Sequence, residues 1–195
     1  MNAPVRGLIG PNAILQHLPV LDAAIGPRQR DALLYLADVS APPPESGMIP
    51  QDDVARFHRF VRLYLPDRAD AVQRAAGLGT ADYILAHRIP RPAQRLIRLM
   101  PAALGARVLA AAIAKHAWTF AGTGAFGISA RAPLTFAIGR NPLAVAGRAP
   151  SCVWHAAVFE RLFARLVWPD VRVRETACCG CGDPACRFEL TRPGG

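Results

Sequence analysis

Five cysteines at the C-terminal end constrain the fold of this 195-residue chain more than any other feature. They are Cys152, Cys178, Cys179, Cys181 and Cys186, and all lie within the last 44 residues. No apolar run near the N-terminus is long enough for a signal peptide, so we expect a cytoplasmic protein. In that compartment clustered cysteines indicate metal or redox chemistry rather than disulfides, and the C-terminal segment is expected to fold around one centre.

The spacing of these cysteines predicts a structural zinc site. Thiolates prefer zinc held tetrahedrally, and Gly180 and Gly182 allow the tight turn of a C-terminal zinc knuckle. One ligand set is Cys152, Cys178, Cys181 and Cys186, and a second set replaces Cys181 with Glu175. His155, one helical turn after Cys152, is a further candidate ligand. The alternative is a redox pair formed by Cys178 and Cys181, although the strand-to-helix setting of thioredoxin-like proteins is missing around it.

Positive charge is concentrated in the middle of the chain. Lysine and arginine number 23 against 14 acids, and no acid occurs between Asp82 and Glu160. That segment holds nine bases, namely Arg88, Arg91, Arg95, Arg98, Arg107, Lys115, Arg131, Arg140 and Arg148. Such a block either serves solubility or attracts an anionic partner, which is nucleic acid, a membrane surface, an acidic protein or a carboxylate ligand. Nucleic acid is disfavoured because stacking aromatics are not interleaved with the arginines.

Hydrophobic periodicity predicts a single domain over residues 1–195, of which residues 1–120 are mainly helical. Helices are expected at residues 12–21, 28–37, 54–65, 70–76, 82–87 and 104–120, with one more opening at Pro90. The glycines at 77 and 79 are expected to separate two short helices, and His17 and His58 are expected at the surface. The last helix carries little charge, so we expect it to be buried on most sides. No apolar stretch is long enough to span a membrane.

Residues 121–195 are expected to be rich in strands. Alternating or β-branched runs predict strands at residues 125–129, 134–138, 171–175 and 187–192, with a helix over residues 153–168. The predicted fold class is therefore α+β, with the helical N-terminal half packed on a roughly four-stranded antiparallel sheet.

A glycine motif invites a nucleotide-binding interpretation, which we reject. Gly122, Gly124 and Gly127 fit G-x-G-x-x-G, but a dinucleotide site needs a strand before the motif and a helix after it. Here a helix precedes the motif and no acid follows before Glu160. We expect these glycines to form a bend between a helix and a strand, so no nicotinamide or flavin site is evident.

Several C-terminal motifs occur together in this chain. They are Phe136, Asn141-Pro142, Cys152, Glu175-Thr-Ala-Cys178 and Gly182-Asp-Pro-Ala-Cys186-Arg-Phe188. This combination resembles the 4-vinyl reductase domain family, which includes sensors of aromatic compounds that hold a structural zinc. The resemblance implies Cys152, Glu175, Cys178 and Cys186 as zinc ligands, and so favours Glu175 over Cys181.

The whole chain is similar to the members of this family that serve bacteriochlorophyll biosynthesis. That likeness implies a divinyl tetrapyrrole ligand, protochlorophyllide or chlorophyllide, and a fold similar to transport-particle subunits with a pocket between helices and sheet. The family name implies reduction of the 8-vinyl group. A reduction needs its reagent, so we favour a protein that binds the pigment and delivers it to other pigment-biosynthesis enzymes. A homodimer and a peripheral position at the photosynthetic membrane are compatible with this role.

A flat, largely apolar macrocycle needs an apolar cleft with a few polar groups. Trp118, Phe120, Phe126, Phe136 and Trp154 are candidates for its walls, although aromatic residues more often belong to a core. Candidates for a pigment carboxylate are Arg91, Arg95, Arg98 and Arg131, and among them Arg95 and Arg98 are preferred. Candidates for an axial ligand of a magnesium tetrapyrrole are His87, His116 and His155. His116 is preferred because it lies beside Trp118.

Overall fold

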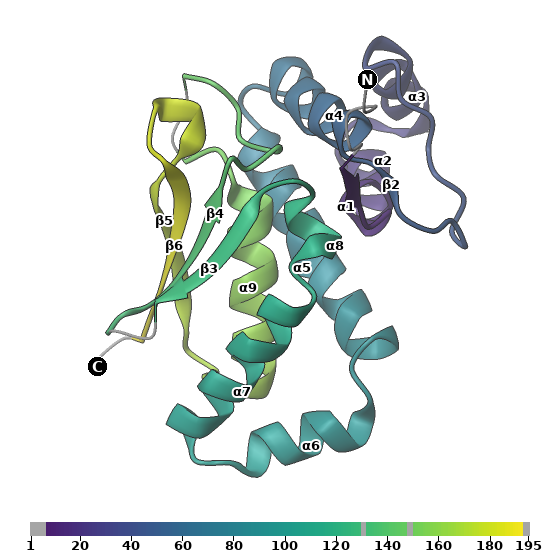
Figure 1. The fold of residues 1–195 in the computed structure, drawn as a ribbon. Coiled ribbons are helices and arrows are strands. Elements are labelled where there is room, and N and C mark those ends of the chain that lie inside the picture. Colours follow the sequence, from purple (N-terminus) through teal and green to yellow (C-terminus); the bar gives the residue numbers. More distant parts are fainter. Residues whose placement is uncertain (1–6, 130–131, 148–149, 193–195) are drawn as a thin grey trace, which may run out of the picture.

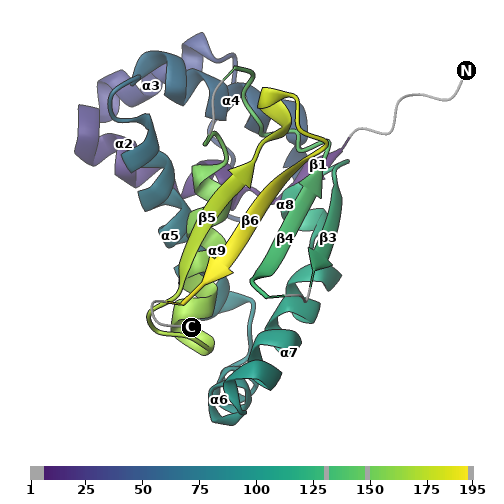
Figure 2. The same ribbon diagram turned by 90° about the vertical axis from the view of Figure 1, so that its left-hand side faces the viewer.

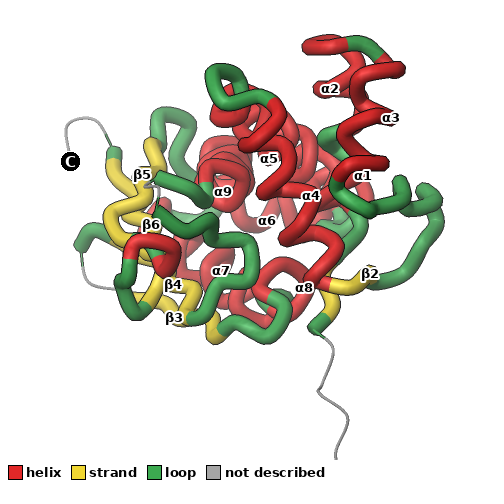
Figure 3. Tube along the Cα trace, turned by 90° about the horizontal axis from the view of Figure 1, so that it is seen from above, coloured by secondary structure: helices red, strands yellow, loops and turns green. Residues whose placement is uncertain are grey.

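A computed structural model of the chain describes residues 7–129, 132–147 and 150–192. A four-stranded sheet forms one side of the molecule, and helix α9 (Val153–Leu166) covers its inner face (Figure 1). Helix α5 (Ala69–His87) packs on α9, and the N-terminal helices lie beyond α5 when the molecule is seen from above (Figure 3). Among the described residues, none of the helices combines the length and the apolar character needed to cross a bilayer.

The sheet confirms the antiparallel arrangement predicted from the alternating runs. Its strands are β3 (Ala125–Ser129), β4 (Leu134–Gly139), β5 (Arg172–Ala177) and β6 (Ala185–Thr191), in the order β3-β4-β6-β5 (Figure 2). Helix α9 lies between the second and third of these strands along the chain, as expected. Phe136 stands opposite Phe188 in the register of β4 and β6, and both are fully buried against α9. Alternate residues such as Arg172 and Arg187 face solvent.

Aromatic side chains from sheet and helix form the centre of the core. The ring of Phe159 lies 5.0 Å from that of Phe136 and 5.4 Å from that of Phe188, centroid to centroid. Phe163 lies 5.8 Å from Phe136, so successive turns of α9 contact the same strand. These edge and tilted contacts are the favoured geometries of aromatic pairs, and they fix α9 against the sheet.

Helix α5 is continuous, so the predicted break at its glycines is wrong. A Cβ added at Gly77 would lie 2.6 Å from the backbone oxygen of Trp154. Glycine is needed at this position because α5 and α9 approach closely, not because the helix ends there. The indole of Trp154 donates a hydrogen bond to Thr80 (3.2 Å), and Arg161 of α9 holds Asp82 of α5 through two hydrogen bonds of 2.9 and 2.8 Å.

The N-terminal helices are shorter than predicted, and two of their histidines are buried. The elements are β1 (Leu8–Ile9), α1 (Asn12–Leu15), α2 (Leu18–Ile25), α3 (Pro27–Leu36), β2 (Ile49–Pro50) and α4 (Gln51–Tyr64). His17 stands between α1 and α2 and donates to the Gln73 amide oxygen at 3.2 Å, and His58 donates to the Ala13 carbonyl at 2.9 Å. The surface position expected for His17 and His58 is therefore wrong, because partners distant in sequence satisfy their ring nitrogens.

The single helix expected over residues 104–120 is interrupted. Helix α6 (Arg91–Leu99) leads into α7 (Ala102–Lys115), which ends before His116, and α8 (Trp118–Ala121) follows. Leu104 and Val108 of α7 are exposed, so the expectation that this helix is buried on most sides is wrong. Between α8 and β3, Gly122 has a φ of +55°, and a Cβ on Gly124 would lie 2.8 Å from the Ala121 oxygen. These glycines form a helix-to-strand bend, as predicted.

Replacing Gly77 with alanine tests the close approach of α5 and α9. We expect Gly77→Ala to destabilise the protein by about 1 to 3 kcal/mol, because overpacking outweighs the helix propensity gained. Gly79→Ala is the matched control, since an added Cβ there meets only the flexible Gln16 side chain. Urea unfolding should find Gly79→Ala neutral or up to about 1 kcal/mol more stable. Equal effects of the two substitutions would contradict this packing.

The buried histidines predict a loss of stability in acid. Burial lowers the pKa of His58 to about 4 and that of His155 to about 3. Below pH about 6.5 the unfolded chain binds protons at these positions while the native chain does not, so the free energy of unfolding falls as the pH drops toward 4. Urea titrations at several pH values should show that His58→Gln, which keeps a donor for the Ala13 carbonyl, flattens this slope by up to about 1.4 kcal/mol per pH unit. The exposed His87→Gln should leave the slope unchanged.

Candidate functional site

Four side chains from separate parts of the chain meet beside the upper end of the sheet. Cys152 immediately precedes α9, Glu175 lies in β5, Cys178 follows β5, and Cys186 lies in β6. One ligand atom of each residue lies within 4.8 Å of the corresponding atoms of the other three. The three cysteines are buried and Glu175 is half-buried. This group, here called the cysteine cluster, contains the same four residues that the family resemblance implies.

The distances within the cysteine cluster fit a tetrahedral metal site. The Sγ atoms of Cys152 and Cys186 lie 3.5 Å apart, and those of Cys186 and Cys178 lie 3.9 Å apart. Zinc bound to sulfur at about 2.3 Å in a tetrahedron separates its ligands by about 3.8 Å. The thiols are therefore spaced as zinc ligands would be.

Glu175 supplies a second indication that the cluster fits a cation. Its Oε2 accepts a hydrogen bond from the Cys152 backbone N–H at 2.9 Å. Its Oε1 is buried and has no hydrogen-bond partner among the described residues. Burial raises the pKa of Glu175 to about 7, since its charged form loses solvation. A divalent cation would pair with the free oxygen and offset this cost.

Neighbouring polar groups surround the sulfur atoms. Ser151 Oγ lies 3.0 Å from Cys178 Sγ, and Asn141 donates to Cys152 Sγ at 3.2 Å. Hydrogen bonds from Cys152 and Ser151 lower the pKa of Cys178 to about 4, which favours its thiolate. Sequence reasoning missed Ser151, while the Asn141-Pro142 motif pointed to Asn141 without giving its role.

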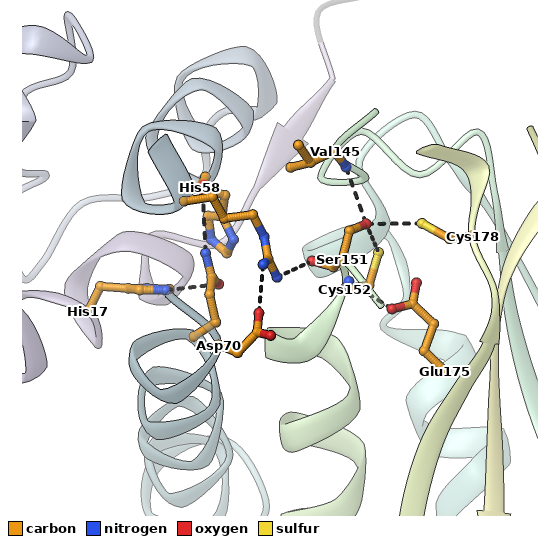
Figure 4. A network of polar contacts seen from close by, with 10 residues as sticks. His17, His58, Asp70, Val145, Ser151, Cys152, Glu175 and Cys178 are labelled. Carbon is orange, nitrogen blue, oxygen red and sulfur yellow. Dashed lines mark hydrogen bonds and ion pairs between the residues drawn. The ribbon is translucent and has the colours of Figure 1, made fainter. Parts of the chain in front are cut away.

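Arg62 connects the cysteine cluster to the N-terminal helices (Figure 4). Its guanidinium donates to the Ser151 backbone oxygen at 2.7 Å and to Asp70 at 2.6 Å. Arg62 itself is buried. A paired and buried arginine gives a directional contact that positions Ser151, so α4 and the cluster are held together.

The other candidate ligands lie outside the cysteine cluster. Cys181 is exposed at the end of the short 3-10 helix η1 (Cys179–Cys181), and Cys179 is half-buried near the Ile138 carbonyl. His155 is buried, with its ring nitrogen 3.4 Å from the Phe120 carbonyl oxygen. Of the two ligand sets that the spacing left open, the structure gathers the one with Glu175.

The predicted pigment residues divide into three groups. Phe126 lies 5.4 Å from both Phe120 and Phe136, so these aromatics are brought together, with Phe136 in the core. His116 and Trp118 are exposed at the C-terminal end of α7. Arg95 and Arg98 are exposed on α6, beyond the other end of α7, which is about 20 Å long. Arg131 lies outside the described residues.

An open cavity of about 700 Å³ lies between α4 and residues 142–146. Arg56, Arg59 and Arg62 line it together with Asp52. Two of these arginines are engaged elsewhere, because Arg56 pairs with Asp53 and Arg62 pairs with Asp70. The backbone N–H of Val145 approaches Ser151 Oγ at 3.3 Å, so the loop that lines the cavity depends on the cluster.

The C-terminal motif and the fold each find relatives among known proteins. Residues 137–192 match the 4-vinyl reductase (4VR) domain. In the fold, the chain is similar to an Fe(II) unliganded H-NOX protein from K. algicida, with a TM-score of 0.64 and 8% identity over 96% of this chain and 98% of that one. An H-NOX protein from S. oneidensis gives a TM-score of 0.58 with 8% identity over 95% and 100% of the two chains. The expected likeness to transport-particle subunits stays a prediction.

Two relatives match almost the whole length of the chain. It is 61% identical to the bacteriochlorophyll synthase 23 kDa chain of Cereibacter sphaeroides, over 95% of this chain and 91% of that protein. It is 51% identical to the protein of the same name from Rhodobacter capsulatus, over 93% and 86% of the two chains. The match to the 4-vinyl reductase domain lies where the cysteine cluster forms. The chain therefore belongs to the 4-vinyl reductase domain family, together with the bacteriochlorophyll synthase 23 kDa chains.

Proposed function

We propose that this protein serves bacteriochlorophyll biosynthesis by binding divinyl protochlorophyllide or chlorophyllide and delivering it to other pigment-biosynthesis enzymes. The identity of 61% with a bacteriochlorophyll synthase 23 kDa chain over 95% of the sequence supports the pathway. The cysteine cluster supports binding over chemistry, and it is the observation that carries this choice. The protein would act in the cytoplasm, at the surface of the photosynthetic membrane.

The cysteine cluster holds a structural zinc ion in this proposal. Three buried thiols and one carboxylate offer four ligands, which closes a tetrahedral site. A catalytic zinc keeps one position for water or substrate, and four protein ligands leave none. The ion would brace the start of α9 against β5 and β6, while its charge would stabilise the buried ligands.

Reduction of the 8-vinyl group is the second candidate function, and the name of the 4-vinyl reductase family favours it. A reduction requires a hydride or electron source. The glycine motif that resembled a nucleotide site forms the bend between α8 and β3. Binding and delivery need no such reagent, so we place this function first.

The proposed pigment site lies where α8 meets β3 (Figure 1). Trp118, Phe120 and Phe126 supply an apolar surface, Phe136 supports it from the core, and His116 would ligate a central magnesium ion. Exposed aromatic surface suits a flat macrocycle. Arg95 and Arg98 lie toward the other end of α7, and in this arrangement their charge is available for a different anion.

Metal analysis of two cysteine variants tests the zinc site. We expect one zinc ion per chain, retained by Cys181→Ser and lost by Cys186→Ser. Loss of the ion should destabilise the protein by several kcal/mol, on the order of 3 or more, because a structural zinc contributes directly to folding. Retained zinc in Cys186→Ser, or lost zinc in Cys181→Ser, would show that the ligand set is different.

Absorption spectroscopy with purified protein tests pigment binding and separates the two functions. Divinyl protochlorophyllide should shift its absorption at a stoichiometric ratio, and added NADPH should leave the vinyl group intact. Trp118→Ala should weaken binding by about tenfold, since it removes a large apolar contact. Tyr35→Ala, at an exposed aromatic on α3, should not. Conversion of the pigment by this protein alone would establish the reductase instead.

A further inference from the structure

Helix α6 presents apolar side chains to solvent. Gln94 and Ile97 are buried, and the Gln94 side chain donates hydrogen bonds to the carbonyl oxygens of Leu85 and Ile89. These contacts fix which side of α6 faces the protein. Leu96 and Leu99 on the other side remain 59% and 84% exposed. Two leucines at such exposure keep a large apolar area in water, which marks an interaction surface when more residues join it.

Helix α7 extends the same apolar surface. Leu104 and Val108 are 48% and 37% exposed, and they lie four residues apart, on one side of the helix. Leu99 and Leu104 flank the connection at Met100 and Pro101, so the two helices contribute neighbouring parts of one surface. This surface, here called the α6–α7 face, consists of the exposed side chains of Leu96, Leu99, Leu104 and Val108 with the bases around them.

The bases around these leucines are Arg91, Arg95, Arg98, Arg107 and Lys115, and all of them are exposed. The segment between Asp82 and Glu160 contains no acid that could neutralise them. The two flanking acids are engaged elsewhere, since Asp82 pairs with Arg161 and Glu160 pairs with Arg74. The α6–α7 face is therefore apolar and positively charged at the same time.

The position of α6 makes this face accessible to a flat surface. In two perpendicular views α6 forms the lower end of the molecule, at the opposite end from α3 (Figures 1 and 2). Helices that lie in a membrane interface combine an apolar side, which enters the headgroup region, with lysines and arginines that contact anionic lipids. We infer that the α6–α7 face docks the protein on the surface of a membrane that contains anionic lipids.

A lipid surface fits this face better than a second copy of the chain. Another copy would bring the same positive charge against it, and like charges repel. Anionic headgroups neutralise the arginines, while the acyl boundary accepts the leucines. The inference does not depend on pigment binding, and vesicles without pigment are sufficient to test it.

Co-sedimentation of the full chain with vesicles measures this docking. We expect binding to phosphatidylcholine vesicles that contain phosphatidylglycerol, weaker binding to phosphatidylcholine alone, and release as salt is raised. Leu96→Gln/Leu99→Gln and Arg91→Gln/Arg95→Gln should each weaken binding at least about tenfold, because each removes one of the two attractions. All four residues are exposed, and circular dichroism should show that both variants are folded.

Two matched variants control for apolar character and charge elsewhere on the molecule. Tyr35→Gln/Leu36→Gln changes an exposed apolar pair on α3, and Arg172→Gln/Arg174→Gln removes two exposed charges on β5. Both should bind vesicles as the unmodified protein does. Failure of the unmodified protein to bind anionic vesicles would overturn the inference in favour of an acidic protein partner. Equal binding by the α6 variants and their controls would overturn the assignment to this face.

Discussion

The meeting of three thiols and a carboxylate beside the upper end of the sheet is the constraint on which the rest of the structure depends. Cys152, Glu175, Cys178 and Cys186 come from the loop before α9 and from the β5–β6 hairpin. Burying so many potential anions is costly unless a cation or hydrogen bonds compensate them. The free Oε1 of Glu175 shows that hydrogen bonds within the described chain do not complete that compensation.

The position of the cluster determines the position of the helices. Cys152 immediately precedes α9, so the start of this helix is fixed relative to β5 and β6. Arg62 then joins α4 to the same loop through the Ser151 carbonyl. From there α9 runs down the sheet, and Gly77 lets α5 approach its backbone. A change at the cluster is therefore transmitted to the helical part through two contacts, one covalent along α9 and one through Arg62.

The sequence predicted those features that depend on local pattern and spacing. Alternating residues revealed the strands, and the cysteine spacing with Glu175 revealed the cluster. It could not predict features set by distant partners. A glycine such as Gly77 reads as a helix break until Trp154 is known to lie against it. His17 and His58 read as surface residues because Gln73 and the Ala13 carbonyl are remote in sequence. Low charge in α7 did not distinguish a buried helix from one with an exposed apolar side.

The distribution of acids explains why the two ends of the molecule differ in character. Asp82 and Glu160 border the acid-free segment, and both are used to hold α5 and α9 together or to the sheet, since Glu160 also accepts the Val173 N–H at 2.9 Å. The long-range packing of the core thus consumes the acids nearest to the bases of α6 and α7. No residue of the intervening segment can replace them, because none is acidic. The positive charge at the lower end is consequently left for a partner outside the chain, whereas the cluster at the upper end is closed by the chain itself.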